Sequence, residues 1–115
     1  MPIPELTKRS AEQQLGEFCD RRVPQFARDQ MYLEYRSRGN DLSLIERRVP
    51  WDGSDREWTS RRIALFRWDP TTATWILKWA NRHGKWLKYP DFGPVGDIAI
   101  AIKEVDDDPF CCFWG

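Results

Sequence analysis

The 115 residues of this chain suffice for one domain with one hydrophobic core, and a composition of 41% hydrophobic and 31% charged residues excludes a disordered chain and a membrane protein. The first residues lack the basic start and apolar stretch of a signal peptide, so we expect a cytoplasmic protein. The formal net charge is zero, but residues 31–89 hold 12 lysines and arginines against 7 acids, whereas residues 90–115 hold 1 against 6.

The first predicted element is a helix over about residues 8–23, preceded by a loose extension over residues 1–7. Apolar side chains recur at helical spacing through this range. Ser10 and Gln13 match a capping box at its start, and Pro24 disfavours helix at the residue before it.

Five strands are predicted next, because the apolar period changes from helical spacing to two. Turn residues separate them closely, and such short connections join antiparallel neighbours. The predicted strands start at Met31 and then cover Leu42–Val49, Arg62–Trp68, Thr74–Ala80 and Lys85–Tyr89.

A second helix is predicted after Asp97, whose carboxylate can cap it. Its apolar residues recur at spacings of three and four. The aspartates at 106–108 are unfavourable at the carboxyl end of a helix, so we expect them to meet basic side chains. The predicted fold class is α+β, with residues 1–115 in a single domain: a five-stranded antiparallel β-meander with an N-terminal and a C-terminal helix.

Several short motifs resemble a known family. It is catalogued as domain of unknown function three-thousand-and-twenty-four, and the resemblance runs from about Phe18 to the end of the chain. It implies a stand-alone bacterial cytoplasmic protein and no assigned activity. The motifs are Phe18-Cys19-Asp20-Arg21-Arg22-Val23-Pro24, Arg28-Asp29-Gln30, Glu46-Arg47-Arg48-Val49-Pro50-Trp51, Glu57-Trp58 and Phe113-Trp114-Gly115.

Arginine and tryptophan are interleaved through the middle of the chain. Cations that follow phosphates and aromatic rings that stack on bases are typical of a single-strand nucleic-acid platform. The alternative is structural: Trp75 and Trp79 share one face of a strand, and Trp68 and Trp86 can pack across strands onto them. The residues that we expect to bind a ligand border or lie in the loop after the second strand: Arg47, Arg48, Trp51, Trp58, Arg61 and Arg62.

The sequence thus favours a non-enzymatic module that binds an anionic ligand, nucleic acid first. A second hypothesis is a protein–protein adaptor or regulatory subunit that uses the apolar tail Phe110–Trp114 or a sheet edge. A third is a metal-dependent hydrolase built on the acids at 52–57 and 106–108.

No metal site or other cofactor is expected from the remaining residue types. The three cysteines lack the spacing of a zinc or redox pair, and the single histidine, His83, precedes a turn glycine. For the arginines, pairing with nearby acids is the alternative to ligand binding.

Overall fold

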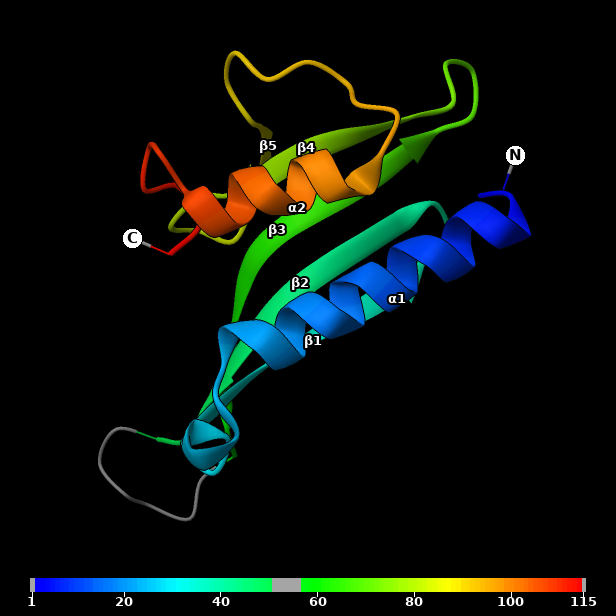
Figure 1. Ribbon diagram of the computed structural model, residues 1–115. Coiled ribbons are helices and arrows are strands. Elements are labelled where there is room, and N and C mark those ends of the chain that lie inside the picture. Colours follow the sequence, from blue (N-terminus) through cyan, green and yellow to red (C-terminus); the bar gives the residue numbers. More distant parts are fainter. Residues whose placement is uncertain (1, 51–56, 115) are drawn as a thin grey trace.

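A computed structural model describes residues 2–50 and 57–114 of the chain. It contains two long helices, a short 3-10 helix and one sheet (Figure 1). In chain order the elements are α1 (Glu5–Arg22), η1 (Gln25–Ala27), β1 (Met31–Arg38), β2 (Asp41–Arg48), β3 (Thr59–Asp69), β4 (Thr74–Ala80), β5 (Trp86–Lys88) and α2 (Ile98–Asp107).

The five strands form an antiparallel meander in the order β1-β2-β3-β4-β5, which confirms the predicted fold class. β3 is the longest strand, and its first residues lie beyond the pairing with β4, which begins at Ala64 and Trp79. Near Thr59, one edge of β3 therefore has no neighbouring strand among the described residues.

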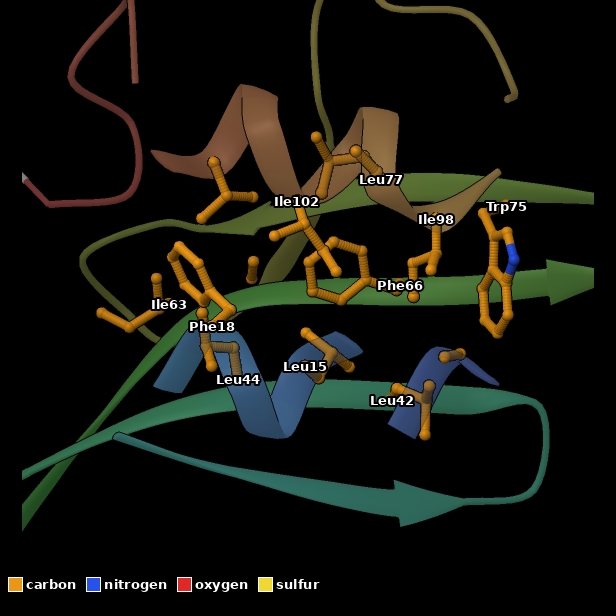
Figure 2. Close-up of a cluster of buried hydrophobic side chains, with 14 of the residues drawn as sticks. Leu15, Phe18, Leu42, Leu44, Ile63, Phe66, Trp75, Leu77, Ile98 and Ile102 are labelled. Carbon is orange, nitrogen blue, oxygen red and sulfur yellow. The ribbon is translucent and has the colours of Figure 1, made fainter. Parts of the chain in front are cut away.

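Both helices lie on the same face of the sheet, α1 over β1 and β2 and α2 over β3 and β4 (Figure 1). The hydrophobic core fills the space between them and the sheet (Figure 2). Leu15 and Phe18 enter it from α1, Ile102 enters from α2, and Leu44 and Phe66 enter from the sheet. No helix in the described part of the chain is both long and apolar enough to cross a bilayer.

α1 begins earlier than predicted. Its N-cap is Pro4, and Ile3 is buried at 6% exposure, so residues 3–7 do not form the loose extension that was expected. Ser10 lies inside the helix, where its hydroxyl accepts from Gln14, and the predicted capping box is wrong. Proline starts a helix readily because it has no backbone N–H that would need a partner.

α2 agrees with its prediction. Asp97 caps α2 by accepting from the backbone N–H of Ala99 at 3.0 Å. Asp106 pairs with Arg22 at 2.6 Å, so an acid near the carboxyl end of α2 does meet a basic side chain from α1. This ion pair ties the two helices together where they meet.

Candidate functional site on the open face of the sheet

The strand register assigns each side chain of the sheet to one of two faces. Leu33 of β1 and Leu44 of β2 lie in the core, so their neighbours Tyr32 and Ile45 point to the opposite face. Residues that pair across strands share a face, which extends the assignment over all five strands. Both helices lie on the core side (Figure 1), and we call the other side the open face.

Basic side chains dominate the open face. Among the described strand residues, its acids are Glu34, Asp41 and Asp69. Its cations are Arg36, Arg38, Arg47, Arg62, Arg67, Lys78 and Lys88. Seven positive charges against three negative ones give this face a clear excess of positive charge within a chain whose formal net charge is zero.

One row of residues crosses the open face from edge to edge. Cross-strand pairing joins Arg36 to Ser43, Ser43 to Leu65, Leu65 to Lys78, and Lys78 to Lys88. The last two are direct cross-strand partners with like charge, an arrangement that destabilises a sheet. No ion pair between either lysine and a described carboxylate relieves this repulsion.

Some of the other cations are partly neutralised. Arg67 holds Asp41 in a two-pronged contact at 2.8 and 3.0 Å, and this hydrogen bonding raises the pKa of Arg67. Glu34 accepts from Arg36 at 2.9 Å and lies 3.7 Å from Arg47. Arg38, Arg62, Lys78 and Lys88 have no described carboxylate partner, and three of these four cations lie on β4, β5 and the start of β3.

Aromatic rings accompany these cations. Trp58 lies just before β3 and contacts Tyr32 of β1, with ring centroids 5.3 Å apart. Near the other edge, the guanidinium group of Arg62 lies over the ring of Trp86, with Cζ 5.7 Å from the centroid. All three rings are half-buried, so each keeps surface that a planar ligand can reach.

Five of the six predicted ligand-binding residues are described, and they divide between the two faces. Arg47, Trp58 and Arg62 belong to the open face, where Arg47 and Arg62 lie diagonally across β2 and β3. Trp51 lies outside the described residues. Arg48 and Arg61 point to the helix-covered side.

The two arginines on the covered side have structural contacts. Arg48 donates to the carboxylate of Glu46 at 2.7 Å. Glu46 is only 5% exposed, so Arg48 supplies the partner that this buried carboxylate needs. This hydrogen bond raises the pKa of Arg48. Arg61 donates to the carbonyl oxygen of Phe113 at 2.5 Å and so holds the tail of the chain.

Of the four tryptophans with a predicted structural role, three have it. Trp68, Trp75 and Trp79 belong to the core or pack against it, as predicted. Trp86 does not, because it pairs with Ala80 on the open face. The sequence does indicate this position of Trp86, because side chains alternate along a strand and the charged Lys88 lies two residues away on the same face.

A comparison with models of protein families identifies the family of this chain. The model for a domain of unknown function, DUF3024, matches residues 3–115. The chain belongs to the DUF3024 family. No curated protein and no solved structure matches it.

The acids of this DUF3024 chain do not form a metal site in the described residues, where no group of three potential ligands occurs. Asp106 and Asp107 pair with Arg22 and Lys103. Asp108 accepts from the backbone N–H groups of Phe113 and Trp114 at 3.1 and 2.9 Å. The acids at 52 and 55 lie outside the described residues.

The apolar tail of the DUF3024 chain packs back onto the domain. Phe113 is 1% exposed and contacts the ring of Tyr89 at 5.0 Å between centroids. Trp114 lies against Arg22, 4.1 Å from Cζ to the ring centroid, and donates from Nε1 to the carbonyl of Val105 at 2.7 Å. Of the tail's large apolar side chains, Phe110 is the exposed one, at 61%.

Proposed function

We propose that this protein is a non-enzymatic module that binds single-stranded nucleic acid on the open face of its sheet. The single observation that carries the proposal is the direct pairing of Lys78 with Lys88 on that face. Like charges placed opposite each other cost stability in the free protein. A polyanion lying across the sheet would turn this cost into binding energy.

The charge distribution supports the proposal. Nucleic-acid binding depends on cations that replace the counterions of the phosphates, and a local excess of positive charge is enough for this. The zero net charge of the chain conceals that excess, because acids outnumber lysines and arginines by 6 to 1 in residues 90–115, which include α2 on the far side of the sheet. Asp106 and Asp107 of α2 are paired there with Arg22 and Lys103.

The aromatic side chains favour a single strand over a duplex. Bases stack on aromatic rings only when they are unstacked from their own partners, and each such contact contributes about 1–3 kcal/mol. Trp58 and Tyr32 lie toward β1, and Trp86 lies on β5, so the rings mark two separate parts of the open face. A strand running from one part to the other would pass Arg47 and Arg62, and the pair Lys78 and Lys88 forms the next row beyond Trp86.

The two other hypotheses have less support. An adaptor that docks through its tail would need Phe113 and Trp114 to be available, and both are engaged inside the domain. A hydrolase would need converging acids, and the described acids at 106–108 are occupied by other contacts. The three free cysteines fit a reducing compartment, so we place the binding activity in the cytoplasm.

The test is a binding titration with short labelled single- and double-stranded DNA and RNA at several salt concentrations. The test variant carries Lys78→Gln and Lys88→Gln. The control carries Arg9→Gln and Lys103→Gln, which remove the same charge from exposed positions on the helix-covered side.

We expect the native protein to bind single strands more tightly than duplexes. The test variant should bind more weakly. The slope of the logarithm of its binding constant against the logarithm of the salt concentration should fall in magnitude by up to about 1.4, because each phosphate contact on a single strand contributes about 0.7 to this salt slope. The control should match the native slope. Equal losses in the two variants, or no binding at low salt, would contradict the proposal.

A further inference from the structure

A cleft of about 620 Å³ lies at one end of the sheet, beside the start of β3, where this strand extends beyond its pairing with β4. One wall comes from β3, one from the turn that joins β4 to β5, and one from the tail of the chain. The lining residues used below are Arg61, Arg62, Arg82, Ala80, Gly84 and Cys112.

Three guanidinium groups line this cleft, and none forms an ion pair with a described carboxylate. Arg61 and Arg62 are instead held by backbone carbonyls, those of Phe113 and Gly84, at 2.5 and 2.8 Å. A carbonyl fixes the direction of an arginine without cancelling its charge. Each guanidinium group therefore keeps its positive charge, and its remaining N–H groups can donate to a ligand.

The cleft contains no acidic residue among its described walls. Burial is the main cause that raises the pKa of the Cys112 thiol, so this group stays neutral at physiological pH and adds no negative charge. Elsewhere on the surface, Arg22, Arg36 and Arg67 lie opposite carboxylates. The cleft thus differs from the rest of the surface in the concentration of its unbalanced positive charge.

Arg62 connects the cleft with the open face. It lines the cleft and also lies over the ring of Trp86, 5.7 Å from Cζ to the centroid. Ala80, which pairs with Trp86 across β4 and β5, lines the cleft as well. A base stacked on Trp86 would therefore have its phosphate at the mouth of the cleft.

We propose that the arginine cleft binds the terminal phosphate monoester of a nucleic-acid strand whose end lies at Trp86. The inference rests on the proposed function and adds recognition of the strand's end. A phosphate monoester carries about 1.5 to 2 negative charges at pH 7, more than the single charge of an internal phosphodiester. Three unneutralised guanidinium groups fit the more highly charged group better.

The position of the cleft also favours an end over the middle of a strand. The tail and the turn between β4 and β5 supply walls beside β3, and the sheet stops there because β4 ends at Ala80. Polarity is left to the experiment, because a 5′ and a 3′ phosphate present the same chemistry.

The experiment compares three forms of one short oligothymidylate by fluorescence anisotropy: with a 5′ phosphate, with a 3′ phosphate, and with hydroxyl groups at both ends. They are titrated with the native protein, with Arg82→Gln and with Arg36→Gln. Both arginines are exposed, but Arg82 lines the cleft and Arg36 lies on the opposite edge strand. Circular dichroism verifies that both variants are folded.

We expect one phosphorylated form to bind native protein about tenfold more tightly than the hydroxyl form, a difference that Arg82→Gln removes. Arg36→Gln should weaken all three forms alike and keep the preference. Equal binding of the three forms by native protein, or a preference that survives in Arg82→Gln, would overturn end recognition and leave the proposed function standing. Absence of binding to every form would overturn both.

Discussion

The guanidinium group of Arg62 lies over the indole ring of Trp86, although the two residues belong to strands that are not neighbours in the sheet. Contact is possible because β4 ends at Ala80 while β3 continues past it. Arg62 also donates to the carbonyl of Gly84, in the turn that leads into β5. The short strand β5 is therefore held by its pairing with β4 and by the contacts of Arg62 from β3.

Trp86→Ala and Lys88→Gln should weaken nucleic-acid binding in different ways. Removing the ring should cost about 1–3 kcal/mol of binding free energy with an unchanged salt slope, because stacking releases no counterions. Removing the charge should lower the slope by about 0.7. Anisotropy titrations at several salt concentrations separate the two effects.

Lys88→Gln should not destabilise the protein, since it relieves the repulsion with Lys78. Urea unfolding would measure this. A variant that bound normally but unfolded more easily would assign Lys88 a structural role and contradict the prediction.

The tail should be part of the folded domain. Phe113→Ala should lower the free energy of unfolding by about 3–5 kcal/mol, because it empties a site that is 1% exposed. Phe110→Ala, at 61% exposure, should change it by less than about 0.5 kcal/mol. Urea unfolding of both variants measures the difference, and equal small effects would show that the tail is not anchored.

The strands could be predicted from the sequence because their period of two and their turn residues are local signals. Which arginine faces which side could not, because β3 reads as apolar at every position from Ile63 to Phe66. Its pairing with β2 slips at this point: Leu44 pairs with Ala64, but Ile45 pairs with Arg62. Ile63 therefore bulges and joins the core, although strict alternation would place it on the same face as Leu65.

The cleft depends on contacts that no local pattern contains. Its walls bring the turn after β4 next to the tail, which is about thirty residues further along the chain. The anchoring of the tail by Arg61 is likewise a long-range contact. Interleaved arginine and tryptophan are visible in the sequence, but the backbone topology decides which of them meet.

Two glycines should respond in opposite ways to alanine. Gly16 lies inside α1, and an added Cβ would meet Tyr35 at 3.7 Å, an ordinary contact. Gly16→Ala should therefore raise the free energy of unfolding by about 0.5–1 kcal/mol through helix propensity. Gly84 has a φ of +76°, so Gly84→Ala should lower it by about 1–2 kcal/mol. Thermal or urea unfolding distinguishes them, and a shift in the same direction for both would refute the backbone argument.

Cys19 should make stability fall at alkaline pH. Burial, and then the charge of Asp20, raise the pKa of its thiol from 9.0 to about 12 in the folded protein. Above pH 9 the unfolded chain loses this proton while the folded chain keeps it, so rising pH favours unfolding. Between pH 9 and 12 the loss attributable to this group approaches about 1.4 kcal/mol for each pH unit.

The measurement is urea unfolding under reducing conditions from about pH 8 to about pH 10.5, for native protein and Cys19→Ala. Tyr89 also has a raised pKa, through burial and its hydrogen bond to Glu104, and it lowers stability with pH in both proteins. The native protein should nevertheless lose stability more steeply, because only it carries the Cys19 thiol. Parallel curves for the two proteins would mean that the thiol ionises as easily in the folded state as in the unfolded chain.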